Sequence, residues 1–122
     1  MKFMLLCYDD EVFWKNAGPA ALNAAREEAV QLTHDLNSRG QYVRASPLQP
    51  AATAVSVQVR GGERQVTDGP FAETREVLGG FYLIDVKDLN EALNIAARHP
   101  GARVGTVEVR PVLELTGLPQ PH

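Results

Sequence analysis

The sequence predicts a small α+β domain in which two helices cover one face of an antiparallel sheet. Apolar residues alternate with a period of two in several short segments, as in strands, and recur at intervals of three and four in two longer segments, as in helices. The segments follow one another as strand, helix, strand, hairpin, strand, helix and strand. Apart from the extra hairpin strand, this order is the split β-α-β pattern of ferredoxin-like folds.

The first third of the chain predicts a strand, a loop and a helix. Residues 2–8 form a strand with apolar side chains on both faces, and residues 9–18 follow as a loop. Pro19 suits the first turn of a helix, and Gly40 suits the residue after its end. The buried stripe of this helix comprises Leu22, Ala25, Ala29, Leu32 and Leu36.

The middle of the chain predicts four further strands and two sharp turns. Residues 53–60 alternate valine with polar residues, which is typical of a half-buried strand. Gly61 and Gly62 favour a two-residue hairpin turn, and the composition of residues 68–71 favours a second turn. The other predicted elements of this region are strands at 41–46, 63–67 and 81–86, and a loop or single helical turn at 72–77.

A second helix and a last strand complete the predicted fold. Asp88 and Glu91 have the spacing of a capping box, which marks the start of a helix. The helix ends at residues 99–101, where histidine is followed by proline and glycine. Residues 103–110 then alternate valine with polar residues and predict the last strand.

Length and composition describe one globular domain. The chain has 122 residues, of which 44% are hydrophobic and 22% are charged. We expect a single domain over residues 1–115 and a mobile tail, rich in proline and glycine, over residues 116–122. Cys7 is the one cysteine, which excludes an internal disulfide. The apolar run at residues 2–8 is too short to span a bilayer and ends in acidic residues, unlike a signal peptide, so we expect a cytoplasmic protein.

Charge and motifs argue against several classes of function. The net charge is −3 and the basic residues are scattered, so we expect binding neither to nucleic acid nor to a membrane surface. His34, His99 and His122 lack the spacing of metal ligands, and no HExxH or CxxC motif occurs, so we expect no metal. The GxGxxG, P-loop and GxSxG motifs are also missing, and we expect no cofactor.

Two helices leave the second face of the sheet without a cover. The strands at 2–8 and 81–86 are apolar on both faces apart from Asp85, whereas those at 53–60 and 103–110 place polar groups on one face. An apolar centre with polar margins suits a dimer interface that contains a cleft, because an apolar patch of that size is a liability on a monomer. We therefore expect a homodimer in which two sheets pack face to face across a two-fold axis.

One long segment carries a family resemblance. It comprises residues 66–76, VTDGPFAETRE, and residues 78–84, LGGFYLI. Together with residues 1–6 and 107–111, it resembles the DGPF group of the YCII-related family. The resemblance implies a dimeric α+β barrel built from two ferredoxin-like units, with the active site in a cleft between the sheet and the partner subunit.

The resemblance implies no agreed activity. The wider superfamily includes lactone isomerases, dehalogenating enzymes and monooxygenases, so the fold does not choose a reaction. The YciI-like branch has a proposed histidine–aspartate pair, but the matching positions here are Ala29 and Ser38. His34 and Asp35 are adjacent, and neighbours on a helix point about 100° apart, so they do not replace that pair. We therefore do not expect this chain to use the mechanism proposed for that branch.

Five residues are candidates for ligand binding. Glu108 and Arg110 share a strand face. They could form an ion pair with each other or part of a dimer interface. Alternatively, Arg110 could bind an anion through two hydrogen bonds. Arg44 on the second strand is a similar candidate. Asp68 is expected to fix the Gly-Pro turn through backbone N–H groups, and its alternative role is a base or acceptor in the cleft. Tyr82 is expected to be a buried tyrosine with a satisfied hydroxyl, or to line the cleft.

Asp68 and Glu73 are the two candidates for catalysis. Glu73 lies close in sequence to Arg75 and Glu76, and these three side chains could clamp a small polar ligand. A solvated charged loop is the favoured interpretation, because such residues usually lie at the surface.

Three functions remain open. The first is a homodimer that binds a small molecule, in an accessory or regulatory role. The second is a cofactor-free isomerase or lyase acting on a small organic acid or lactone, which needs a carboxylate of raised pKa in a partly apolar cleft. The third is an interaction module for an extracytoplasmic-function sigma factor, which rests on the resemblance alone, since members often lie beside such factors in bacterial genomes.

Overall fold

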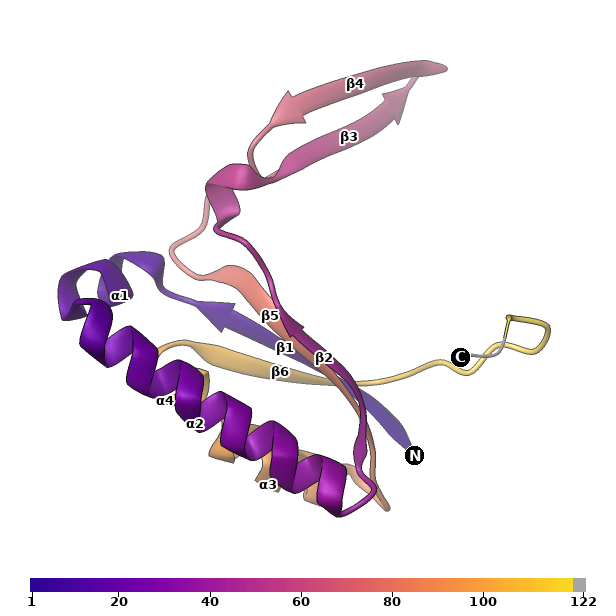
Figure 1. The fold of residues 1–122 in the computed structure, drawn as a ribbon. Coiled ribbons are helices and arrows are strands. Elements are labelled where there is room, and N and C mark those ends of the chain that lie inside the picture. Colours follow the sequence, from indigo (N-terminus) through magenta and orange to yellow (C-terminus); the bar gives the residue numbers. More distant parts are fainter. Residues whose placement is uncertain (120–122) are drawn as a thin grey trace.

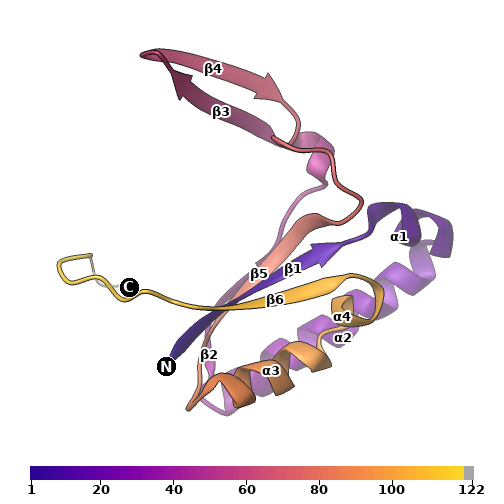
Figure 2. The same cartoon turned by 180° about the vertical axis from the view of Figure 1, so that it is seen from behind.

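The computed structural model describes residues 1–119, and its centre is a four-stranded antiparallel sheet with helices on one face (Figure 1). A separate two-stranded hairpin projects from one end of this sheet, as the view from behind also shows (Figure 2). The fold is α+β and fits the predicted ferredoxin-like pattern. In chain order the elements are β1 (Lys2–Asp9), α1 (Glu11–Ala17), α2 (Pro19–Ser38), β2 (Tyr42–Pro47), the 3₁₀ helix η1 (Ala51–Thr53), β3 (Val55–Arg60), β4 (Glu63–Asp68), β5 (Val77–Asp85), α3 (Leu89–Arg98), α4 (Gly101–Val104) and β6 (Thr106–Pro111).

The sheet has the strand order β2-β5-β1-β6, so the first strand of the chain lies inside it. β1 pairs antiparallel with both β5 and β6, and β2 pairs antiparallel with β5. This order explains the sequence pattern, because the two segments that are apolar on both faces are the two central strands. The edge strands β2 and β6 carry polar side chains along their length, whereas the charged residues of the central strands, Lys2, Asp9 and Asp85, lie at the strand ends.

The hydrophobic core lies between the sheet and the helices. Phe3 and Leu5 of β1 and Ile84 of β5 point toward the helices and are at most 1% exposed. Burial of one such side chain contributes about 1.5–3 kcal/mol to stability. The other core residues are Cys7, Leu32, Leu36, Tyr82, Val86, Ala92, Ile95 and Ala96. Among the described residues, no helix is long and apolar enough to cross a membrane.

The prediction of a loop over residues 9–18 is wrong, because this segment contains the helix α1. Asp10 is the N-cap of α1 and accepts a hydrogen bond from the backbone N–H of Phe13 at 3.1 Å. The indole N–H of Trp14 donates to the carboxylate of Asp9 at 2.5 Å, which fastens the helix to the end of β1. The acidic residues that end the apolar run are therefore a cap signal, and the sequence interpretation missed it.

The last strand starts later than residue 103, where the sequence predicts it, because Gly101–Val104 forms the short helix α4. Gly105 connects this helix to β6, which begins at Thr106. A Cβ atom on Gly105 would lie 2.2 Å from the carbonyl oxygen of Tyr8, so only glycine permits this approach of the two backbones.

The hairpin of β3 and β4 forms with the predicted turn but without the predicted burial. Gly61 and Gly62 have φ angles of +58° and +79°, as a two-residue hairpin turn requires. The alternation predicts a half-buried strand with its valines on one face, but Val55, Val57 and Val59 are 63%, 62% and 62% exposed. The reason is that β3 and β4 make a sheet of their own and do not join the four-stranded sheet.

The chain continues past β6 without a further helix or strand over residues 112–119. This segment leads away from the sheet (Figure 2). The rest of the predicted tail, residues 120–122, lies outside the described residues.

Candidate functional site

The helices leave one face of the four-stranded sheet uncovered, and we call it the open face. Strand pairing aligns its side chains in rows that cross all four strands. One row runs from β2 to β6 through Arg44, Leu83, Met4 and Arg110. The next row runs through Ser46, Phe81, Leu6 and Glu108.

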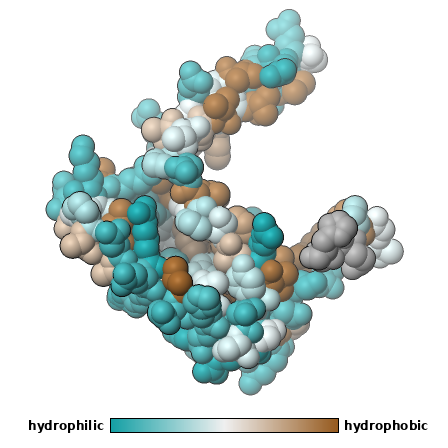
Figure 3. Space-filling model, in the orientation of Figure 1, coloured by the Kyte–Doolittle hydropathy of each residue, from teal (hydrophilic) through white to brown (hydrophobic). Residues whose placement is uncertain are grey.

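The open face has an apolar centre and polar edges. Met4 and Leu6 of β1 and Phe81 and Leu83 of β5 fill the two central strands, and all four are only partly buried. Their side chains point away from the core, because successive side chains of a strand alternate between the two faces of the sheet. The projecting hairpin leaves a hollow between itself and the body of the protein (Figure 3).

The polar edges differ in how their charges are paired. At the β6 edge, the Nε of Arg110 donates to the Oε2 of Glu108 at 2.8 Å. At the β2 edge, Arg44 is exposed, and within residues 1–119 it takes part in no ion pair. The two arginines are separated by three strand spacings, which is about 14 Å. The open face therefore offers an unpaired cation beside an apolar platform.

Asp68 does not lie on the open face. It is the last residue of β4 in the hairpin, where it pairs with Val55, and it is exposed. The turn after it is closed by other groups: the N–H of Gly69 donates to the carbonyl of Ala54 at 2.7 Å, and the hydroxyl of Ser56 donates to the carbonyl of Gly69 at 2.8 Å. Gly69 has a φ of +90°, which explains why glycine stands at this position.

Tyr82 lies on the opposite face of the sheet from Arg44, against the helices, and is 6% exposed. Its hydroxyl lies 3.1 Å from the hydroxyl of Thr33 and 3.3 Å from the carbonyl oxygen of Ala29. Burial raises the pKa of Tyr82. Its ring meets that of His99 edge-on, with the centroids 5.5 Å apart. The predicted satisfied hydroxyl is present, and Tyr82 shares no face with Arg44, Glu108 or Arg110.

The charged loop between β4 and β5 is tied to the body through one of its three candidate residues. The guanidinium of Arg75 donates to the carboxylate of Asp10 at 3.1 Å. The pKa of Asp10 is lowered by the Phe13 N–H bond and, more weakly, by Arg75. Glu73 is exposed and Glu76 is partly buried, and within residues 1–119 neither carboxylate takes part in an ion pair. Arg75 therefore anchors the loop at α1.

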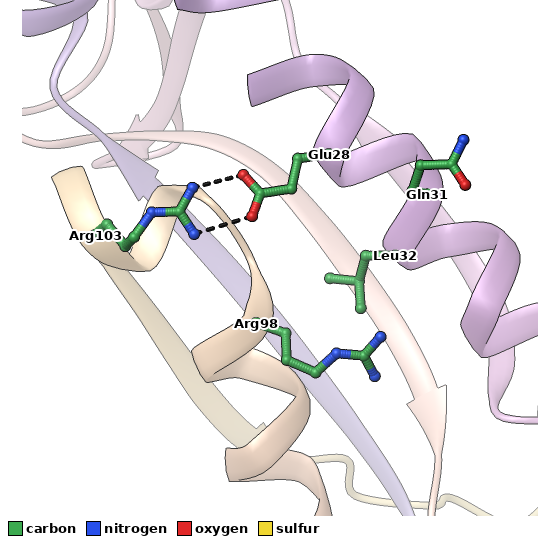
Figure 4. A pocket seen from close by; sticks show the side chains of 5 residues that line it. All are labelled: Glu28, Gln31, Leu32, Arg98 and Arg103. Carbon is green, nitrogen blue, oxygen red and sulfur yellow. Dashed lines mark hydrogen bonds and ion pairs between the residues drawn. The ribbon is translucent and has the colours of Figure 1, made fainter. Parts of the chain in front are cut away.

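A second depression lies on the helix side, between α2 and the helices α3 and α4 (Figure 4). Its volume is about 390 Å³. The carboxylate of Glu28 accepts two hydrogen bonds from Arg103, at 3.0 and 2.5 Å, and Arg98 donates to Asp35 at 2.7 Å. These bonds hold the pKa of Glu28 and of Asp35 below the usual values. The charges around this depression thus neutralise each other, and its carboxylates are poor bases.

The sequence suggests the edge residues of the open face but not their alignment. Arg44, Glu108 and Arg110 were recognised as charged residues on strands, and all three lie on this face. The pairing that connects them through Leu83 and Met4 depends on strand order and register, for which the sequence carries no direct signal. The pairing of Glu28 with Arg103 on the helix side also went unnoticed, because both look like ordinary surface residues.

No metal centre is apparent in the described part of the chain, where no group of three or more His, Cys, Asp or Glu residues could hold an ion. His34 is exposed, and His99 is partly buried at the end of α3. His122 lies outside the described residues.

Comparison with known proteins gives two matches over nearly the whole chain. The YCII-related domain family matches residues 1–116. A protein of Rhizobium meliloti (strain 1021) that is described as "Uncharacterized protein R00369" is 38% identical over 122 residues, with 92% of each chain covered.

Proposed function

The chain belongs to the YCII-related domain family, and from that premise we propose that it acts as a homodimer that binds a small organic anion on the open face of its sheet. The observation that carries this proposal is the row of Arg44, Leu83, Met4 and Arg110. It combines an arginine at each edge with an apolar centre.

The apolar centre supports a second copy as the cover of this face. Leu6 and Phe81 are neighbours on the central strands, and both are only partly buried in a single chain. Two sheets that pack face to face lie about 10 Å apart, and their side chains fill the space between them. Polar edges then remain at the margin of the interface, where water and a ligand have access.

The arginines support an anion as the ligand. A guanidinium binds a carboxylate through two parallel hydrogen bonds, and the bond is stronger where water is excluded. Arg110 is held by Glu108, whereas Arg44 has no ion-pair partner within residues 1–119. Arg44 is therefore the first contact for a carboxylate, and Leu83 beside it provides the apolar surface for the rest of the ligand.

A binding protein is favoured over a cofactor-free isomerase or lyase. Proton abstraction requires a base whose pKa is tuned toward the operating pH. The pKa values of Asp10, Glu28 and Asp35 are instead lowered, away from neutral pH, because each carboxylate accepts hydrogen bonds. These three carboxylates therefore do not support the enzymatic alternative.

Thermal unfolding in the presence of matched ligands tests the proposal. The ligands are aromatic and short aliphatic carboxylates, each compared with its neutral amide. A ligand present at 100 times its Kd stabilises the folded state by about 2.7 kcal/mol, a shift of several degrees for a domain of this size. The carboxylates should raise the Tm, and the amides should not.

Two variants localise the effect. Arg44→Gln removes the unpaired cation from the open face, and Arg26→Gln removes the same charge from exposed α2. Only Arg44→Gln should lose the carboxylate response. An equal response to carboxylates and amides, or an undiminished response in Arg44→Gln, would overturn the proposal.

A further inference from the structure

The hairpin of β3 and β4 has one polar face and one valine face. Cross-strand pairing puts Ser56 with Thr67, Gln58 with Gln65, and Arg60 with Glu63 on the polar face. The other face, which we call the valine face, carries three pairs. They are Val55 with Asp68, Val57 with Val66, and Val59 with Arg64.

The four valines of this face are exposed in the single chain. Val55, Val57 and Val59 are 62–63% exposed, and Val66 is 53% exposed. Figure 1 shows the hairpin standing away from the body, and Figure 3 shows hydrophobic residues along it. An isolated two-stranded hairpin is marginally stable in water, and clustered exposed β-branched residues mark an interaction surface.

The charges on the valine face identify the kind of partner. Asp68 lies at one end of the face and Arg64 at the other, with Val66 between them on β4. The four residue steps from Arg64 to Asp68 span about 13 Å along the strand, so this aspartate and this arginine do not pair within one hairpin. A surface with opposite charges at its two ends is complementary to a copy of itself turned end for end.

We propose that the valine face binds the valine face of a second copy of the chain, around a two-fold axis that crosses the strands at Val57 and Val66. Symmetry then places each of these valines against its own counterpart, and Val55 against Val59 of the other copy. Asp68 of each copy lies opposite Arg64 of the other, which makes two equivalent ion pairs. Stacked sheets are about 10 Å apart, a gap that an arginine and an aspartate side chain bridge together.

This surface is distinct from the open face, and the inference does not depend on the proposed anion site. A stable complex buries about 800 Å² on each partner, and four valines supply only part of that area. The hairpin contact therefore adds to another contact between the same copies or links dimers into a larger assembly. Variants that change the charges of the hairpin alter this contact and leave the side chains of any contact through Leu6 and Phe81 unchanged.

Charge reversal tests the contact. Asp68→Arg and Arg64→Asp each turn two attractive pairs into repulsive ones, and each should weaken self-association on the order of tenfold, as measured by sedimentation equilibrium. An equal mixture of the two variants restores opposite charges at both ends, so mixed assemblies should form at the wild-type affinity. Native mass spectrometry with one variant isotopically labelled identifies them.

The polar face provides matched controls. Glu63→Arg and Arg60→Asp make the same charge changes on the opposite side of the hairpin, and they should leave association unchanged. Crosslinking gives a second measurement: Val57→Cys should join two copies through a short bis-maleimide, and Gln58→Cys should not. Wild-type association in the single reversal variants, no recovery in their mixture, or equal crosslinking at both positions would each contradict the proposal.

Discussion

Arg44 and Arg110 stand at opposite ends of one row of side chains that crosses the whole sheet, with Leu83 and Met4 between them. The two arginines come from the edge strands β2 and β6, which lie 66 positions apart in the sequence at these residues. Their common row makes the open face an apolar platform with an arginine at each margin, of which Arg110 is paired with Glu108. The proposed dimer and the proposed ligand both follow from this arrangement.

A charge placed in the middle of the open face should abolish the sheet-to-sheet contact. Leu6→Arg puts a second cation beside Glu108, which is already paired with Arg110, and the opposing sheet would remove it from water at a large cost in free energy. We expect a monomer in light scattering at concentrations where the wild type forms the proposed dimer. Val30→Arg is the control, because Val30 is a 52% exposed residue of α2 on the helix side. A dimer that persists in Leu6→Arg would argue against the open face as the interface.

Removal of the Tyr82 hydroxyl should cost stability without affecting ligand binding. In Tyr82→Phe, the hydroxyl of Thr33 keeps its bond to the carbonyl of Ala29 at 2.8 Å, so no polar group loses every partner. We expect a loss of about 1 kcal/mol in denaturant unfolding. The carboxylate response should match that of the wild type, because Tyr82 lies on the helix face. A selective loss of that response would place Tyr82 in the ligand site.

Stability should fall as the pH drops below about 6.5, because of His99. Burial lowers the pKa of His99 from its usual 6.5, with smaller opposing effects from Asp9 and Glu28 and a smaller supporting effect from Arg103. The unfolded chain therefore binds a proton more readily than the folded protein does, and unfolding becomes more favourable as the pH falls. The loss begins near pH 6.5 and levels off below the folded-state pKa.

The variant His99→Asn isolates this effect. The Nδ1 of His99 accepts a hydrogen bond from the N–H of Gly101 at 2.9 Å, and an asparagine side chain offers an acceptor in its place. Urea unfolding between pH 5 and pH 8 should show a shallower pH dependence in His99→Asn than in the wild type. The exposed histidine variant His34→Asn is the control. The same slope in both variants would assign the acid sensitivity to other groups.

Asp10 should contribute mainly as a helix cap and only secondarily through its ion pair. Asp10→Asn keeps a capping side chain and loses the charge toward Arg75, whereas Asp10→Ala loses both. Arg75 is 87% exposed, and exposed ion pairs contribute little. We expect a Tm for Asp10→Asn close to that of Arg75→Gln, and a clearly lower Tm for Asp10→Ala. Equal losses in Asp10→Asn and Asp10→Ala would show that the charge matters more than the cap.

The sequence reveals the fold where burial leaves a pattern along the chain. The central strands are recognisable because residues on both faces are apolar, as in Phe3 and Met4, and the main helices because their stripes repeat. Helix α1 leaves no such pattern in the sequence, since it has seven residues and none of them is buried. Its signal is local, the cap at Asp10.

The candidate site is harder to predict from the sequence, because it depends on which residues of neighbouring strands lie side by side. Alternation assigns Val55, Val57 and Val59 to one face but does not say whether anything covers that face. In the same way, Tyr82 belongs to a core strand by composition, but its face is decided by pairing with Leu5. Arg44 and Arg110 become one site only when both neighbours of each central strand are known.

The methyl resonance of Met4 provides the most direct test of the open-face account. The chain has two methionines: Met4 lies between Leu83 and Arg110 in the row, and Met1 is 65% exposed. In protein labelled with ¹³C-methyl methionine, the Met4 signal should move on dilution and again on addition of an aromatic carboxylate, while the Met1 signal stays in place. A Met4 signal that is indifferent to both concentration and carboxylate would contradict the claim that this face binds a second copy and an anion.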